Sequence, residues 1–221
     1  MPRSEAPPGA EKWVPSPPHD LAELKQAAAQ CEGCELFADA TQTVFGRGAP
    51  DARVVFVGEQ PGDVEDQQGL PFVGPAGRVL RDAVGEVGIE VPWVYITNAV
   101  KHFRFELRGK RRIHHTPGPA HITACRPWVV AEFALLKPEV VVVLGATAGK
   151  ALLGPSFRVT KSRGQLMPWP AAAQHPEDFP GAEAQVIATI HPSAVLRADD
   201  RDAAYRGFVD DLRIARAALR D

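Results

Sequence analysis

Three polar residues of different chemistry come directly after short apolar runs in this sequence. Glu59, Asn98 and His191 supply a carboxylate, an amide and an imidazole. If the runs are parallel β-strands, their carboxyl ends meet at one edge of the sheet, where ligands bind in open α/β folds. One polar residue there could be chance, and Glu59 could simply cap the next helix, but three complementary groups indicate a site.

A strongly basic segment follows the strand that ends at Asn98. Residues 101–115 hold six Lys and Arg against one Glu, a charge of +5 in a chain whose net charge is −2, so the remainder carries −7. This distribution is typical of a protein that contacts a phosphate backbone at one place, although a solvated loop without a ligand is the common alternative. The run 110–114 (KRRIH) can fold back toward Glu59, and a carboxylate there would make the imidazole of His114 a better nucleophile or base.

The spacing of the cysteines indicates a metal site. Cys31 and Cys34 form a C-x-x-C pair, which is typical of metal ligands or of a redox pair. A redox pair usually follows a strand and opens a helix, whereas this pair follows a predicted helix, so a metal is favoured. Cys125 is the third and last cysteine, and His102 is the best candidate for a fourth ligand. This set suits zinc or an iron–sulfur cluster, which spacing does not separate, and a free buried Cys125 remains an alternative.

The stretch 145–150 (GATAGK) is similar to a phosphate-binding loop but departs from it twice. It has three residues between its glycines instead of four, and Ala151 stands where a magnesium-binding Ser or Thr belongs. We therefore predict tight packing between a strand and a helix here, and no nucleoside triphosphate site.

The order of the predicted elements indicates an α/β fold. Apolar runs predict strands over residues 53–57, 94–97, 140–144 and 186–190, and helical spacing predicts helices over residues 21–29, 75–87, 121–136, 147–153 and 202–219. Strands that alternate with helices form a mostly parallel sheet covered on both faces. We expect a three-layer αβα sandwich with a central four-stranded, mostly parallel sheet. The basic segment is expected to be a long loop, and residues 168–182 an exposed insertion.

Length and composition fit one domain. The chain has 221 residues, of which 45% are hydrophobic, enough for one well-buried core. Residues 1–18 are rich in proline and lack the apolar core of a signal peptide, so we expect a disordered leader ahead of a single domain over residues 19–221. The longest apolar runs are too short to span a bilayer, and three cysteines argue against a disulfide scaffold, which favours the cytoplasm.

With these segments in place, the chain from residue 21 onward resembles the uracil-DNA glycosylase superfamily, close to its iron–sulfur family 4. The motifs that carry the resemblance are 58–62 (GEQPG), 70–74 (LPFVG), 95–98 (YITN), 124–128 (ACRPW) and 191–193 (HPS). Two departures refine it. Family 4 has a cysteine where this chain has His102, and the inserted KRRIH run at 110–114 resembles the UdgX-type branch.

The resemblance implies a uracil-DNA glycosylase with a [4Fe-4S] cluster on Cys31, Cys34, His102 and Cys125. The cluster would be structural, holding the N-terminal helix and the DNA-facing loop together. In the UdgX-type branch, uracil is excised and the protein is then joined to the abasic sugar, here through His114. The expected products are free uracil and a covalent protein–DNA adduct at C1′.

The resemblance also assigns roles around the base, which must leave the stack to be reached. Phe72 would stack on uracil, and Asn98 would read its O4/N3 edge, which excludes cytosine. His191 would stabilise the uracil anion together with backbone N–H groups of the 58–62 loop. His114 would attack C1′ while Glu59 orients its ring or holds its proton. The uracil pocket would also be formed by Gly58, Gln60 and Asp63.

The remaining roles concern the DNA strand. The residues expected to contact it are Lys110, Arg111, Arg112, Ser193 and Arg197. The three loop cations would hold phosphates, and residues 194–197 would wedge into the gap left by the flipped base. Single-stranded DNA is the expected preference because no pairing is lost on flipping. One strand needs only one copy of the protein, so we expect a monomer.

Two other functions stay open at this point. In the first, an ordinary glycosylase turns over with water activated by Glu59, and His114 only binds. In the second, the chain is a non-catalytic DNA-binding module with a zinc site. The presence of His114 together with the three polar residues at the strand ends argues against the second.

Overall fold

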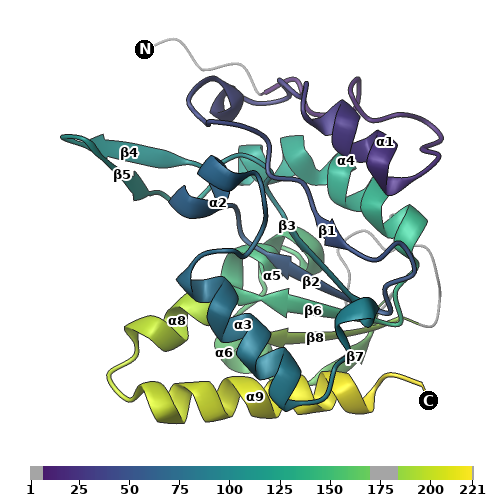
Figure 1. Ribbon diagram of the computed structural model, residues 1–221, viewed down its shortest axis with the longest axis vertical. Helices are drawn as coiled ribbons and strands as arrows, with labels where there is room; N and C mark the ends of the chain where they lie inside the picture. Colours follow the sequence, from purple (N-terminus) through teal and green to yellow (C-terminus); the bar gives the residue numbers. More distant parts are fainter. Residues whose placement is uncertain (1–6, 170–183, 221) are drawn as a thin grey trace.

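The computed structural model describes residues 7–169 and 184–220. Its centre is a six-stranded sheet in the order β1-β3-β2-β6-β8-β7 (Figure 1). The four inner strands are β2 (Val54–Gly58), β3 (Val94–Asn98), β6 (Val140–Leu144) and β8 (Gln185–Thr189), and neighbouring ones are parallel. The predicted αβα fold with a parallel four-stranded centre is confirmed.

Two short strands extend this sheet at its edges. β1 (Arg47–Gly48) pairs antiparallel with β3, and β7 (Leu166–Pro168) pairs antiparallel with β8. The sequence does not predict them, because runs of two and three residues show no strand periodicity. The insertion predicted at 168–182 starts at the end of β7, and its residues from 170 onward lie outside the described part of the chain.

Helices lie on both sides of the sheet. Their bounds are α1 (Leu21–Ala28), α2 (Asp63–Gln68), α3 (Pro75–Glu86), α4 (Pro119–Leu136), α5 (Gly145–Leu153), α6 (Val159–Ser162), α8 (Pro192–Arg197) and α9 (Arg201–Ala217), with 3₁₀ turns at Glu35–Ala38 and Val91–Trp93. The side chains of Asp20 and Asp200 cap the first turns of α1 and α9. No helix in the described part of the chain is long and apolar enough to cross a lipid bilayer.

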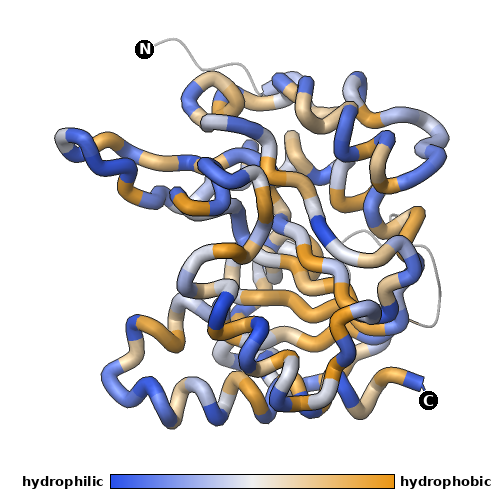
Figure 2. Tube along the Cα trace, in the orientation of Figure 1, coloured by the Kyte–Doolittle hydropathy of each residue, from blue (hydrophilic) through white to orange (hydrophobic). Residues whose placement is uncertain are grey.

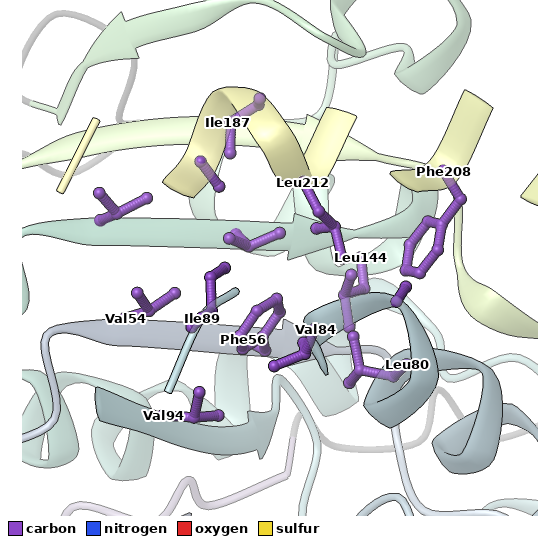
Figure 3. Packing of buried hydrophobic residues seen from close by; sticks show 14 of the residues in the cluster. Val54, Phe56, Leu80, Val84, Ile89, Val94, Leu144, Ile187, Phe208 and Leu212 are labelled. Carbon is purple, nitrogen blue, oxygen red and sulfur yellow. The ribbon is translucent and has the colours of Figure 1, made fainter. Parts of the chain in front are cut away.

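The sheet divides the hydrophobic core into two layers. One layer packs Phe56 and its neighbours against Leu80 of α3 and against Phe208 and Leu212 of α9 (Figure 3). The other packs the opposite sheet face, including Val143, against α4 and α5. Figure 2 shows the inner strands as predominantly hydrophobic, whereas much of the outer surface is hydrophilic. Because the inner strands are covered on both faces, their sequences are continuous apolar runs.

The basic segment after β3 forms a β-hairpin instead of the predicted loop. β4 (Phe105–Arg108) and β5 (Arg111–His114) pair antiparallel around a two-residue turn. Gly109 in this turn has φ +61°, a left-handed conformation that glycine adopts without steric cost. The hairpin projects from the body near α2 (Figure 1). Its charge-rich strands lack a clear apolar alternation, so the sequence does not reveal them.

A third apolar cluster contains all three cysteines, where α1 meets α4. Part of the predicted 1–18 leader joins this cluster. Ala10 is 1% exposed, and its N–H donates to the carbonyl of Ala124 in α4. This part of the leader therefore packs with the domain instead of being disordered, whereas residues 1–6 lie outside the described part of the chain.

Candidate active site

A cavity of about 810 Å³ opens at the carboxyl end of the parallel strands. Its wall is formed by residues at or just beyond the carboxyl ends of β2, β3, β6 and β8, by the end of β5, and by residues of α2, α3, α5 and α8. The register aligns the strand ends, since Gly58 of β2 pairs with Asn98 of β3. The predicted site residues found in its wall are Glu59, Gln60, Asp63, Phe72, Asn98, His114, His191, Ser193 and Arg197.

Glu59 is held by a different partner on each carboxylate oxygen. His114 Nε2 lies 3.2 Å from Oε1, and the Thr147 hydroxyl donates to Oε2. Burial raises the pKa of Glu59, but the hydrogen bonds to His114 and Thr147 outweigh burial, so the net pKa is lowered. Glu59 is therefore an anion at neutral pH, and it contacts the imidazole of His114, which lies at the end of the basic hairpin.

His191 is held as a hydrogen-bond donor to the cavity. Its Nδ1 accepts the Ser193 backbone N–H at 3.2 Å and lies 2.8 Å from Ser193 Oγ. Because Nδ1 acts as an acceptor, the hydrogen of the neutral ring is on Nε2. Burial lowers the pKa of His191 to about 4, so the ring is neutral at pH 7. Ser193, which the sequence assigns to DNA, therefore also orients this histidine.

One end of the cavity is formed by Phe72 and Asn98. Asn98 is 1% exposed, and its Oδ1 has no hydrogen-bond partner among the described residues. A buried amide oxygen without a partner is costly, so it indicates where a ligand N–H would bind. Phe72 has φ +53°, a conformation that is strained for a residue other than glycine. A Cβ at Gly58 would overlap both Asn98 Oδ1 and the Phe72 ring, so the strand needs glycine there.

Gln60 lies in the cavity wall, but its amide group binds the base of the hairpin. Nε2 donates to the carbonyls of Arg104 at 3.1 Å and His115 at 3.2 Å, and Oε1 accepts the Arg104 N–H at 3.1 Å. These two residues flank β4 and β5. Gln60 therefore shapes the cavity by fixing the hairpin that carries His114.

Arg112 is paired with carboxylates. Its Nε lies 2.6 Å from Asp63 Oδ1, its Nη1 lies 2.6 Å from Asp66 Oδ2, and its guanidinium is 5.1 Å from the centroid of Phe105. Because Asp66 is fully buried, the pair anchors the hairpin to α2. Two of its N–H groups bind carboxylates and Nη1 also donates to the Thr41 hydroxyl at 3.0 Å, so Arg112 has a structural role in addition to the phosphate contact predicted for it. No local pattern shows a pairing between residues so far apart in sequence.

Lys110 and Arg111 remain exposed at the turn of the hairpin, where a phosphate backbone can reach them.

Thr147 is a site residue that the sequence analysis misses. It lies in the GATAGK stretch, which indeed joins a strand to a helix, but it also lines the cavity. The rule that finds Glu59 would have found it, because it follows the carboxyl end of the parallel strand β6.

The three cysteines are buried free thiols in the third apolar cluster. Burial raises the pKa of Cys125 to about 12, and the nearby Cys34 and Cys31 raise it as well. Trp128 Nε1 donates to Cys31 Sγ at 3.3 Å, and the Lys101 N–H donates to Cys125 Sγ at 3.2 Å. Hydrogen bonds of this kind are also received by the sulfurs of iron–sulfur clusters.

His102 is oriented by Thr43. Its Nε2 lies 2.8 Å from the Thr43 hydroxyl, which itself donates to the Ala28 carbonyl at 2.9 Å. The hydroxyl must therefore accept from Nε2–H, which leaves Nδ1 with the lone pair that a metal ligand needs. Across residues 7–169 and 184–220, however, no three His, Cys, Asp or Glu side chains are grouped so as to hold a metal ion. Donor types and burial match the predicted ligand set, but a closed site is not formed.

Comparisons with known proteins place the chain in a family. Residues 45–213 match the uracil DNA glycosylase superfamily. The chain is 37% identical over 175 residues to a type-4 uracil-DNA glycosylase of Thermotoga maritima, covering 79% of this chain and 82% of the relative. It is 34% identical to a type-4 uracil-DNA glycosylase of Sulfurisphaera tokodaii, covering 80% of this chain and 76% of the relative. It is 32% identical to a type-4 uracil-DNA glycosylase of Pyrobaculum aerophilum, covering 80% of this chain and 85% of the relative. The chain therefore belongs to the uracil DNA glycosylase superfamily and has type-4 uracil-DNA glycosylases among its relatives.

Proposed function

We propose that this protein is a uracil-DNA glycosylase that excises uracil from DNA, preferably single-stranded, and is then joined to the abasic sugar through His114. Family membership and the type-4 relatives support the excision. One observation carries the covalent step: the His114 imidazole, half exposed at the cavity, has its Nε2 3.2 Å from the Glu59 carboxylate. A carboxylate in contact with an imidazole is the arrangement that activates a histidine nucleophile.

Uracil recognition is assigned to Phe72 and Asn98. The base enters the cavity after flipping out of the strand and stacks on the Phe72 ring. Asn98 Oδ1, which has no partner among the described residues, accepts the uracil N3–H, and its Nδ2 donates to O4. Cytosine has an acceptor at N3 and an amino donor at position 4, the reverse of uracil, so an Asn98 amide in this orientation rejects it.

Bond cleavage is assigned to His191. When the bond between C1′ and N1 breaks, its electron pair goes to uracil and leaves an oxocarbenium-like sugar. The Nε2–H of neutral His191 donates to the uracil anion as its charge develops. Loss of one such donor typically costs about 2.7–4 kcal/mol of transition-state stabilisation.

Capture is assigned to His114 and Glu59. The lone pair of one imidazole nitrogen of His114 forms a bond to C1′, and the proton of the other nitrogen passes to Glu59. The immediate products are a neutral N-alkyl imidazole, a protonated Glu59 and the uracil anion. Return of the proton from Glu59 to the uracil anion then gives free uracil and restores the Glu59 carboxylate. The KRRIH hairpin is anchored by Gln60 and Arg112, which supports a role that needs an accurately placed ring.

DNA contacts are assigned to both rims of the cavity. Lys110 and Arg111 on the hairpin and Arg197 on α8 hold phosphates. Residues 194–197 of α8 fill the gap left by the flipped base. We expect a monomer, because one strand engages one cavity.

We also infer that Cys31, Cys34, His102 and Cys125 hold a [4Fe-4S] cluster. Their donor types, their burial and the N–H groups directed at two of the sulfurs support this set. When bound, the cluster would cross-link the segment after α1, the loop after β3 and helix α4. Protein purified without oxygen should be brown and should contain iron and sulfide. His102→Cys should keep the cluster and His102→Ala should lose iron, whereas a colourless protein with bound zinc would support the zinc module.

The covalent step is tested with a uracil-containing single-stranded oligonucleotide. We expect a band of reduced mobility on a denaturing gel that survives heating, and its loss in His114→Ala at unchanged melting temperature. His115→Ala is the matched control, since His115 follows β5 and does not line the cavity. A shifted band in His114→Ala would show that another group is the nucleophile.

Ordinary turnover is the second candidate, because Glu59 is 20% exposed toward the cavity and water can reach it. In that case wild-type protein would release more than one uracil per molecule and give no shifted band. Absence of any uracil release by wild-type protein would contradict both candidates.

A further inference from the structure

The segment Gly145-Ala146-Thr147 lies between the two halves of the site. It begins α5 directly after β6, and all three residues line the cavity. β6 is flanked in the sheet by β2 and β8. Glu59 follows β2 and His191 closely follows β8, so this segment has a catalytic side chain on each side.

Gly145 allows the close approach of His191. Its φ is +88°, and a Cβ at this position would lie 2.9 Å from His191 Cβ. A side chain here would be strained by the backbone and would displace the histidine. The backbone of the segment therefore forms the support against which His191 is placed.

Thr147 supports Glu59 in a different way. Its hydroxyl donates to Glu59 Oε2 while Oε1 faces His114 Nε2. With one donor on each oxygen, rotation of the carboxylate group is restricted, and the oxygen that meets His114 is fixed. The sequence predicts only packing between a strand and a helix for this segment. The hydrogen bond from Thr147 to Glu59 gives it a second role, in the cavity.

We propose that Thr147 is a positioning residue, which holds Glu59 so that its other oxygen stays directed at the imidazole of His114. The inference rests on the proposed function and extends it to the first turn of α5. Thr147 does not touch the reacting atoms. Its effect passes through Glu59, and so it should fall mainly on the step in which His114 is activated.

The same hydrogen bond has a consequence for pH. The hydroxyl stabilises the anionic form of Glu59 and counters the effect of burial, which raises the pKa of the carboxyl group. The groups that face Glu59 are His114 from β5 and His191 ahead of α8, and Asp63 of α2 and Arg197 of α8 lie in the same cavity wall. Without the hydroxyl, the carboxylate should take up a proton at higher pH.

The test compares Thr147→Val, which keeps the shape but removes the hydroxyl, with Thr147→Ser, which keeps the hydroxyl. With protein in excess over a uracil-containing oligonucleotide, Thr147→Val should form the adduct about tenfold more slowly at neutral pH, as expected for one hydrogen bond to a charged group. In the pH profile of this rate, the acid limb, where the rate falls as Glu59 takes up a proton, should move to higher pH. Thr147→Ser should restore the wild-type profile, and the exposed Thr160→Val is the control for a threonine outside the site.

Rates within twofold of wild type and an unmoved acid limb in Thr147→Val would overturn the inference. A slower rate that Thr147→Ser does not restore, with the acid limb in place, would also overturn it, because a purely structural role gives that result. Failure of the proposed function is distinguishable, since wild-type protein would then give no adduct. Thermal melting of each variant shows that the comparison is between folded proteins.

Discussion

Asn98 and His191 contribute to the site as hydrogen-bonding groups with a fixed orientation. The Asn98 amide is buried, and Gly58 and Phe72 leave it little room to move. His191 is fixed because Ser193 occupies its Nδ1, which directs Nε2–H to the cavity. At this scale, function depends on which atom donates and which accepts.

Asn98→Asp keeps the size of the side chain but replaces its Nδ2 donor with a carboxylate oxygen. Uracil O4 is an acceptor, so the variant would oppose it with a second acceptor. We expect the single-turnover rate of uracil release to fall about 10- to 100-fold, the range for a hydrogen bond lost in a buried site. Release of free uracil from a labelled oligonucleotide measures this. An unchanged rate would show that Asn98 does not read the base.

The neutral state of His191 predicts a wide pH range for excision. Because the pKa of His191 is about 4, the ring keeps its Nε2–H donor and carries no charge from pH 8 down to about pH 5. The pKa of Glu59 is also lowered, so its charge persists over this range. We expect the rate of uracil release, measured separately from adduct formation, to be flat between these values. A midpoint near 6.5 that disappears in His191→Gln would contradict this account.

The lowered pKa of His191 also makes the stability of the folded state depend on pH. The unfolded chain binds a proton at His191 near its ordinary pKa of about 6.5, whereas the folded chain resists protonation until about pH 4. The folded state is therefore progressively destabilised as pH falls from about 6.5 toward 4. Urea unfolding at several pH values should show this slope, and it should be smaller in His191→Gln.

The β4–β5 hairpin is the element on which the proposed covalent step depends. It carries His114 at the end of β5, and side-chain contacts with the body hold it in place. Gln60 binds the backbone at its base, and Arg112 binds Asp63 and the buried Asp66. Neither contact involves Phe72 or Asn98, so loosening the hairpin should displace His114 more than the two residues to which base recognition is assigned.

Gln60→Ala removes the side chain that joins the two ends of the hairpin. We expect adduct formation to slow by about tenfold or more, whereas uracil release changes less, because only the placement of His114 is lost. The two rates are measured on the same samples, by gel shift and by free uracil. Lys110→Gln is the control, since it should weaken DNA binding in a salt-dependent way and leave the ratio of the two rates unchanged at saturating DNA. Equal loss of both rates in Gln60→Ala would contradict a role confined to the hairpin.

Sequence reasoning succeeds for elements that are apolar and local. The four inner strands are continuous β-branched runs, so their ends could be predicted, and with them the meeting of Glu59, Asn98 and His191. It fails where structure depends on partners that are distant in sequence. The hairpin strands are charged, and the pairing of Arg112 with Asp63 and Asp66 crosses more than forty residues. Thr147 is missed because the stretch 145–150 is similar to a phosphate-binding loop, and its departures from that loop predict only packing between a strand and a helix.

Across the whole molecule, a buried ion pair connects β3, which ends at Asn98, with the cysteine cluster. Lys101 Nζ lies 2.6 Å from Glu132 Oε2 and donates to the Asn98 carbonyl at 3.0 Å. The backbone N–H of the same lysine donates to Cys125 Sγ. Both charged side chains are almost completely buried, so each depends on the other for stability.

Lys101→Met leaves Glu132 buried without its cation. We expect the free energy of unfolding to fall by about 3–5 kcal/mol, measured by urea denaturation. Arg213→Met is the matched control, because its pairs with Glu86 and Asp210 are exposed and should be worth about 0–1 kcal/mol. Equal effects of the two substitutions would show that the buried pair does not stabilise the fold.

The central claim is that His114 becomes bonded to C1′ of the abasic sugar. The most direct test is to digest the adduct with protease and nuclease and to locate the added mass by tandem mass spectrometry. We predict a deoxyribose phosphate remnant on the imidazole of His114, in the peptide that contains residues 110–114. A remnant on any other side chain, or unmodified peptide from protein that has released uracil, would contradict the account.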